Sequence, residues 1–207
     1  LIKFLSDFES KIVDLSKQFG ECYFEASISG KEEDFQKSAN LQIELEKIFT
    51  SKEDFEILTE IKNSGQIEDE VLKRQLTILY NQYAGNQIPE ELLTEIIEAS
   101  TKIEQKFSTY RAEVNDKKLT DNEIDKILEE SLDSKNLQNV WEASKEIGNI
   151  VANDVISLVK LRNKAARSLG FSNYHEMSLK LSEHDPEMLD QLFDELDELT
   201  KSAFVEL

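Results

Sequence analysis

Apolar residues recur at intervals of three and four along almost the whole chain, and this spacing most constrains the fold. It places apolar side chains along one face of an α-helix. Only 6 of the 207 residues are glycine and 2 are proline, so little interrupts the pattern. No segment has convincing strand alternation. The sequence therefore predicts an all-α fold, an irregular array of eight or nine helices with at least two-thirds of the chain helical and no sheet beyond an isolated hairpin.

The expected helices begin at capping residues and end at breaks in the apolar pattern. The first five run from Phe4 to a break near Gly30, from Phe35 to Phe49, from a Ser51 cap to 63–65, from Asp69 to Tyr83, and from Pro89 through Val114 to 115–116. The sixth starts at a Thr120 cap and is closed by Asp133 and Ser134, the seventh runs from about Leu137 to Leu169, and the last two are capped by Ser172 and by Asp185-Pro186. No low-complexity linker interrupts this series, so residues 1–207 are predicted to form a single all-helical region.

Local signals support several of these ends. Thr120 and Glu123 have the spacing of a capping box, in which each side chain accepts from the other residue's backbone N–H. Pro89 suits a helix start, because the N–H that it lacks would be unpaired there. Gly170 ends the long seventh helix. These signals make the helix boundaries the most specific structural predictions from the sequence.

The charge of the chain excludes some partners. The formal net charge is −19, with 43 acidic residues among which 24 basic ones are scattered. Nucleic acids and anionic membranes bind clustered Lys and Arg, so neither is expected as a partner. No apolar run approaches the roughly 20 residues that span a bilayer. The composition is that of a soluble protein, and its localisation stays open, with an extracytoplasmic location preferred.

The pair His175-Glu176 raises the question of a zinc peptidase motif, HExxH. Its second histidine would stand four residues after the first, on the same helical face. That position is Leu179, and the only other histidine is His184. No two-histidine zinc face can therefore be drawn in this chain. A metal site built from His175 and His184 is a minor hypothesis, because helix ends commonly collect His, Asp and Glu for capping.

Other catalytic constellations are also missing from the sequence. A di-iron bundle needs a glutamate three residues before each histidine, and neither histidine has one. The single cysteine, Cys22, lies in an aromatic, apolar stretch and is expected to be a buried small hydrophobe rather than a nucleophile. No serine stands in G-x-S-x-G, and no glycine-rich phosphate loop occurs. The residues themselves indicate no catalytic site and no metal site.

Three blocks of sequence nevertheless resemble a known family. They are WEASKEIG at 141–148, LRNKAARSLGFSNY at 161–174 and CYFEASIS at 22–29. These blocks look like the long helix, the following turn and the end of the first helix in the angiotensin-converting-enzyme-like peptidases and the related thimet-type oligopeptidases. The resemblance covers most of the chain, and it is strongest from Leu137 to Leu207. The residues that carry it are Trp141, Glu142, Lys145, Gly148, Asn163, Arg167, Gly170 and Tyr174.

The resemblance implies a gluzincin, a zinc metallopeptidase with two largely helical halves that flank a channel. In that family the HExxH helix lies beyond the equivalent of Leu207. The chain would then be the N-terminal helical half of an oligopeptidase or peptidyl-dipeptidase that cleaves short peptides. Zinc is expected in the full-length protein, held by the missing C-terminal half, and no zinc is expected on this chain alone. Lys145 replaces the arginine of the chloride-binding members, which leaves chloride activation open.

A second reading is a non-enzymatic helical module whose acidic surface binds a basic protein partner. An HExxH motif in the coding sequence after Leu207 would favour the peptidase, and a stop codon would favour the module.

The place of Trp141 in the quoted block also leads us to expect that its side chain is largely buried beside the long helix. Truncation to alanine would then cost about 3 to 5 kcal/mol.

Overall fold

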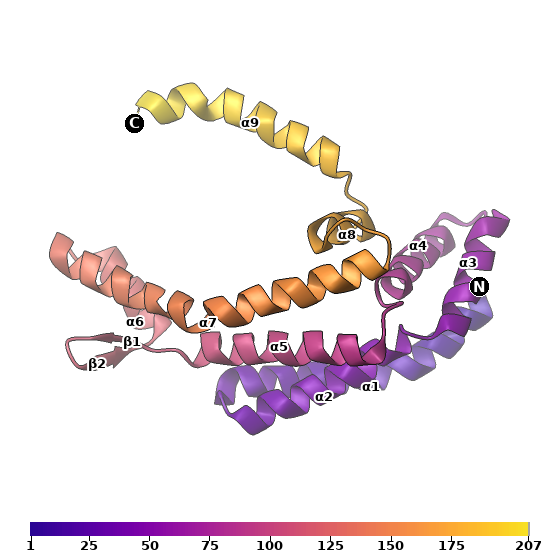
Figure 1. Cartoon of the computed structure of the whole chain (residues 1–207), viewed down its shortest axis with the longest axis horizontal. Helices are drawn as coiled ribbons and strands as arrows, with labels where there is room; N and C mark the ends of the chain where they lie inside the picture. The colour runs from indigo at the N-terminus through magenta and orange to yellow at the C-terminus, as the bar shows by residue number, and fades with distance from the viewer. Residues whose placement is uncertain (207) are drawn as a thin grey trace. The chain divides into compact units, whose positions relative to one another are not determined.

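A computed structural model describes residues 1–206 of the chain and contains nine α-helices and one two-stranded sheet in that range (Figure 1). The helices are α1 (Ile2–Ser29), α2 (Glu32–Ile48), α3 (Lys52–Ser64), α4 (Glu70–Gly85), α5 (Glu90–Thr109), α6 (Asp121–Glu130), α7 (Ser134–Ser168), α8 (Tyr174–Leu181) and α9 (Pro186–Glu206); the strands are β1 (Ala112–Val114) and β2 (Lys117–Leu119). The chain is 82% helical. The predicted all-α array is therefore confirmed.

Most helix ends lie where the local signals place them. The Ser51 side chain accepts from Asp54 N–H at the start of α3, and Gly65 ends that helix in the left-handed region at φ 64°. Thr120 and Glu123 form the complete capping box at the start of α6. The carbonyl of Pro89 accepts from Leu93 N–H at 3.0 Å, which places this proline immediately before α5. These ends form locally, so they could be predicted from a few residues each.

The prediction that the fifth helix continues through Val114 is wrong. Helix α5 ends at Thr109, and Val114 lies in β1, which pairs antiparallel with β2 so that Val114 faces Lys117. Asn115 and Asp116 connect the strands, with φ 51° and 62°. Two consecutive residues with positive φ match the twist of a tight hairpin, and Asn and Asp tolerate that region better than most residues. The residues expected to end a helix thus form a hairpin turn.

Asp133 and Ser134 also have a role other than the expected one. Helix α6 ends at Glu130, and Ser134 is the first residue of α7. The Asp133 carboxylate accepts from Lys135 N–H at 3.0 Å, and its carbonyl accepts from Leu137 N–H at 2.9 Å. A carboxylate at this place satisfies backbone donors that lack a partner in the first helical turn. Asp133 therefore begins the long helix instead of ending the short one.

The contacts of the chain group it into two compact units. The first contains Leu1–Glu9, Glu46–Leu93 and Leu161–Leu207, and the second contains Ser10–Leu45 and Thr94–Lys160. All the boundaries between them fall inside helices, in α1, α2, α5 and α7, and none falls in a linker. The expectation of a single region stays a prediction.

An aromatic cluster forms part of the core of the first unit. The Phe49 and Tyr83 rings lie edge to face, with centroids 5.3 Å apart, and Phe8 lies 5.7 Å from Phe49. Both Phe49 and Tyr83 are almost fully buried. The Tyr83 hydroxyl donates to the Asp54 carboxylate at 3.2 Å. Burial, and then the Asp54 charge, raise the pKa of Tyr83 well above its usual range, so the hydroxyl stays protonated as a donor.

In the second unit, the core cluster around the hairpin consists of Ala112 of β1, Ile124 of α6 and Val140 of α7. The Tyr110 hydroxyl donates to the Ala143 carbonyl at 2.7 Å and ties the start of the hairpin to α7. The side chains of Lys102 and Lys106 on α5 both pair with Asp154 on α7. The hydrogen bond from Lys106 is the largest cause of a lowered pKa at Asp154.

No helix within the described range, residues 1–206, has the length and apolar character that crossing a membrane requires.

Candidate functional site

The eight residues that carry the family resemblance fall into two groups, one in each unit. Trp141, Glu142, Lys145 and Gly148 lie on α7 in the second unit. Asn163, Arg167, Gly170 and Tyr174 lie at the end of α7 and the start of α8, in the first unit. The second group lies around the turn that connects α7 to α8. The first group is spread along several turns of α7.

The turn from α7 into α8 is held by hydrogen bonds that involve the second group. Gly170 is left-handed at φ 88°, and the N–H groups of Gly170 and Phe171 donate to the carbonyls of Arg167 and Ala166, at 3.1 and 3.0 Å. This is the Schellman motif, which ends a helix with glycine in the left-handed position. The Asn163 side chain then accepts from Tyr174 N–H at 2.9 Å. Asn163 and Gly170 therefore set where α8 begins.

The side chains of Tyr174 and Arg167 differ in their surroundings. The Arg162 guanidinium lies over the Tyr174 ring, 5.2 Å from its centroid, a distance that allows a cation–π contact. The Arg167 side chain is exposed, and the described contact at this position is made by its backbone carbonyl. Tyr174 thus belongs to the α7–α8 turn by its side chain, and Arg167 belongs to it by its backbone.

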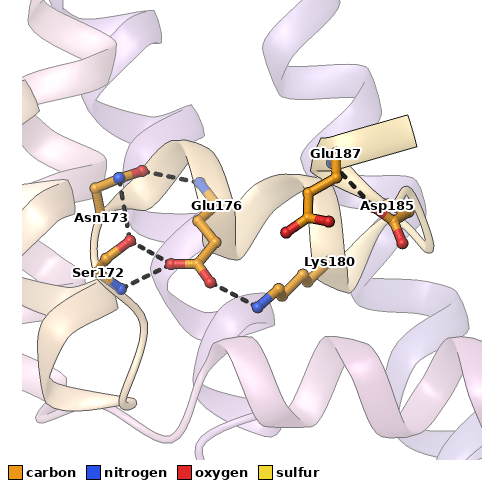
Figure 2. Close-up of polar contacts among 6 residues, drawn as sticks. All are labelled: Ser172, Asn173, Glu176, Lys180, Asp185 and Glu187. Atoms are coloured by element: carbon orange, nitrogen blue, oxygen red, sulfur yellow. Dashed lines mark hydrogen bonds and ion pairs between the residues drawn. The ribbon is translucent and has the colours of Figure 1, made fainter. Parts of the chain in front are cut away.

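Helix α8 is capped by Asn173, so the prediction of Ser172 as the cap is wrong by one residue. The Asn173 side chain accepts from Glu176 N–H at 2.9 Å. Ser172 instead donates to the Glu176 carboxylate, from its backbone N–H at 2.9 Å and from its hydroxyl (Figure 2). The choice between two adjacent polar residues depends on which one has its side chain over the first turn. Here the extended backbone of Asn173 brings its oxygen there.

Glu176 is held as a carboxylate. Lys180, one helical turn further on, donates to it at 2.6 Å, and Ser172 donates twice (Figure 2). Lys180 is the largest cause that lowers the pKa of Glu176, to about 2, followed by Ser172. Glu176 in turn is the largest cause that raises the pKa of Lys180, with smaller effects from Asp185 and Glu187. Neither side chain is poised to exchange a proton near neutral pH.

An open pocket of about 560 Å³ lies beside these residues. It is lined by Glu176, Lys180, Glu183, His184, Asp185, Pro186 and Glu187. Most of its polar groups already have partners. The Asp185 carboxylate, for example, accepts from the N–H groups of Glu187 and Met188 at 2.9 and 3.2 Å, and so caps α9 as expected. The pocket walls are thus built from helix caps and ion pairs.

One contact in this pocket joins residues that lie far apart in the sequence. Arg74 of α4 pairs with Glu183, 109 residues later. Glu183 follows α8 in the left-handed region at φ 64°, where a glycine is more usual. The Asn81 side chain, also on α4, donates to the Leu181 carbonyl at 3.1 Å. No sequence signal indicates these long-range contacts. The N–H of His184 donates to the Leu179 carbonyl and so completes a recognisable helix end.

The two histidines are both exposed, and His184 lines the pocket beside α8. Among residues 1–206 no group of three or more His, Cys, Asp and Glu side chains is arranged to hold a metal ion. The minor hypothesis of a metal site at His175 and His184 therefore gains no support.

Cys22 is buried, as predicted, at one wall of a pocket of about 380 Å³ that also includes Glu21, Lys37 and Glu44.

The prediction that Trp141 is largely buried is wrong. Its side chain is 54% exposed, whereas its neighbour Val140 is 1% exposed and lies in the core beside the hairpin. Adjacent residues on a helix differ by about 100° in direction, so only one of the two can face that core. Lys145 lies over the Trp141 ring at 5.5 Å from the centroid. The tryptophan and the lysine of the quoted block thus meet on an exposed face of α7.

Glu142 and Gly148, the other two residues of this block, also lie on exposed parts of α7. The Glu142 carboxylate accepts from the Gln138 side chain at 2.7 Å. It also lines a small acidic pocket with Glu113 and Glu146, next to the hairpin turn. Burial and the nearby Glu146 charge raise the pKa of Tyr110 in this region. A Cβ at Gly148 would have no heavy atom within 4 Å apart from its chain neighbours and the adjacent helix backbone.

These arrangements place and fix helices. The contacts described around α8 end α7, start α8 and α9, and join α8 to α4. The four signature residues at 141–148 are exposed on α7.

Comparison with known proteins gives one result. The family model for angiotensin-converting enzyme peptidases matches residues 1–204. A search of curated proteins finds no match. Because the family match covers nearly the whole chain, the protein belongs to the angiotensin-converting enzyme family of peptidases.

Proposed function

We propose that this chain is the N-terminal helical part of a zinc-dependent peptidase that cleaves short peptides, either by releasing C-terminal dipeptides or by internal cutting. The family match over residues 1–204 carries this proposal. The zinc ligands and the catalytic glutamate are then supplied by a part of the protein outside this chain. The residues described here would form one wall of the substrate channel and one half of a two-lobed enzyme.

The side chains present do not fit a catalytic zinc site. Such a site uses three protein ligands, and two of them are often histidines four residues apart on one helix. This chain has His175 and His184 only, and Leu179 stands where the second histidine would have to be. No group of metal ligands gathers among residues 1–206. The proposal therefore assigns no catalytic residue to this chain.

The signature residues receive positioning roles in this proposal. Asn163 and Gly170 define the turn from α7 into α8, because the Asn163 side chain accepts from Tyr174 N–H and Gly170 takes the left-handed conformation that ends α7. Tyr174 adds the contact of its ring with Arg162. Trp141, Lys145 and Gly148 lie on an exposed face of α7, where another part of the peptidase or its substrate has access to them. Lys145 keeps the positive charge of the family's arginine without its rigid fork.

Metal analysis and a quenched fluorescent peptide assay test the proposal on two proteins, this 207-residue chain and the longer product of the same gene. We expect the longer product to hold one zinc and to cleave short peptides until a chelator is added. The short chain should retain no stoichiometric zinc and should not cleave. One bound zinc per short chain, or chelator-sensitive cleavage by it, would contradict the proposal.

The alternative is a non-enzymatic module whose acidic surface binds a basic protein. The net charge of −19 favours it. The coding sequence after Leu207 distinguishes the two functions, because the peptidase requires an HExxH motif there, with a glutamate ligand on a following helix.

A further inference from the structure

Helix α9 has an apolar face that is largely exposed in the described structure. Leu189, Leu192, Leu196, Leu199 and Ala203 follow one another at intervals of three and four, and Phe193 and Phe204 widen this apolar face on one side. We call these seven residues the α9 stripe. Leu192, Leu196 and Leu199 are 56%, 52% and 78% exposed. No residue of α9 is buried. Spacing of this kind is typical of a helix that packs lengthwise against another helix.

A helix of this length is unstable without such a partner. Its 21 residues extend over roughly 30 Å, and isolated helices near this length are marginal in water, because most helical stability in proteins comes from packing of the apolar face. The Asp185 cap and the single i,i+3 ion pair between Lys201 and Glu198 add little. An exposed stripe of leucines on a helix thus indicates a docking surface.

Both edges of the α9 stripe are acidic. At 100° per residue, Asp190 and Asp197 fall along one edge and Glu195 along the other. The whole helix carries seven carboxylates and one lysine. Lys201 is already paired with Glu198 at 3.0 Å.

This charge pattern discriminates among possible occupants. Two copies of α9 packed along their stripes, in either direction, would set acidic edges against acidic edges, and like charges there are unfavourable. An anionic lipid surface is repelled for the same reason. A helix with an apolar face edged by Lys and Arg instead gains both apolar burial and charge complementarity.

We propose that the α9 stripe is the docking surface for an amphipathic helix with basic edges, supplied by the catalytic part of the same peptidase. This inference rests on the proposed function, which places that part outside residues 1–207. Beyond the proposed function, the inference specifies where the catalytic part contacts this chain, that the contacting segment is a helix, and that the edges of this helix are positively charged.

Designed peptides test the chemistry of the surface. Two 21-residue amphipathic helices share a leucine face, and one has lysine edges whereas the other has glutamate edges. We expect the lysine-edged peptide to bind this chain, and its affinity to fall about tenfold or more between 50 and 500 mM salt, because exposed charges are screened. Equal binding of both peptides would overturn the charge assignment. A dimer in sedimentation that Leu196→Ser abolishes would show that a second copy is the occupant.

Substitutions locate the surface. Leu196→Ser with Leu199→Ser should weaken binding of the lysine-edged peptide about tenfold or more, because central apolar contacts contribute most to an interface. Ile156→Ser on α7 is the matched control, since Ile156 is also 52% exposed, and it should leave binding unchanged. Asp190→Lys with Asp197→Lys should reverse the preference toward the glutamate-edged peptide. An unchanged preference in that variant, with its helix content intact by circular dichroism, would reject the role of the acidic edges.

Amide hydrogen exchange tests the source of the partner helix. In the longer product of the gene, the α9 amides should exchange at least tenfold more slowly than in this chain, and Leu196→Ser with Leu199→Ser should remove the difference. If zinc and peptidase activity are present but α9 exchanges equally fast in both proteins, only the docking inference fails. If α9 is protected in a longer product without zinc or activity, only the proposed function fails.

Discussion

Val140 and Trp141 are adjacent on α7, and their side chains have opposite surroundings. Val140 is 1% exposed among Ala112 and Ile124, whereas Trp141 is 54% exposed under Lys145. We expect Val140→Ala to reduce the free energy of unfolding by about 1.5 to 3 kcal/mol. Trp141→Ala should reduce it by less than about 1 kcal/mol, mainly through the lost contact with Lys145. Urea unfolding of both variants measures the difference, and a larger loss for Trp141→Ala would contradict the structure.

Glu176 gives the chain a specific response to acid. Its folded pKa, about 2, lies below the ordinary value of 4.5, because Lys180 and Ser172 stabilise the carboxylate. The folded state therefore binds this proton less readily than the unfolded state, and the stabilisation is complete above pH 4.5 and is lost as the pH falls toward 2. The melting temperatures of the parent chain and of Glu176→Gln should differ at pH 6 and converge as the pH falls below 4. A difference that stays constant down to pH 2 would reject this effect.

At the residue scale, the sequence predicts contacts within one helical turn and misses those between distant segments. The Thr120–Glu123 box and the Asp185 cap could be recognised because each needs only three or four neighbouring residues. The pair of Arg74 and Glu183 could not, because the path of the chain decides which two charges meet. The predicted burial of Trp141 is wrong for a related reason. Hydrophobicity favours burial, but the positions of the neighbouring elements decide which side of a helix is covered.

At the element scale, the two signature glycines, Gly148 within α7 and Gly170 just after it, should respond oppositely to the same substitution. Gly148 lies within the helix, and apart from its chain neighbours and the adjacent helix backbone no heavy atom stands within 4 Å of the place that an alanine methyl group would take. Gly148→Ala should therefore stabilise the fold by about 0.5 to 1 kcal/mol. Gly170 also has open space, but its φ is +88°, so Gly170→Ala should destabilise by about 1 to 2 kcal/mol through backbone strain. Thermal unfolding of both variants checks the signs. A gain in stability at Gly170 would show that the helix does not end in the Schellman motif.

The hairpin is the element that periodicity could not reveal. Each of its strands has three residues, too few for alternation to be visible, and the apolar spacing of α5 continues as far as Val114. The signal that could have found it is Asn115-Asp116, two residues suited to positive φ between short segments that hold Ala112 and Leu119 on their inner side. Such a turn and a helix end use similar residues, so the local sequence alone favours neither.

At the scale of the whole molecule, four helices run from one unit into the other. Helices α1, α2, α5 and α7 each contain a boundary between the units. Opening one unit alone would interrupt the backbone hydrogen bonds of these helices, so we expect both units to unfold in a single transition. Trp141, the only tryptophan, lies in the second unit, and its fluorescence should follow the same urea curve as the far-ultraviolet circular dichroism of the whole chain. Two separate midpoints would show that the units unfold independently.

The position of these boundaries also determines whether cleavage by a protease can separate the two units. The connections around Gly65, Asn115 and Leu132 each join two segments of the same unit. A nick there leaves the peptides on both sides packed within that unit, and no single cut at an exposed loop releases either unit intact. Cleavage at these three connections should therefore yield a nicked chain that still migrates as one particle under native conditions, and that separates into fragments only in denaturant.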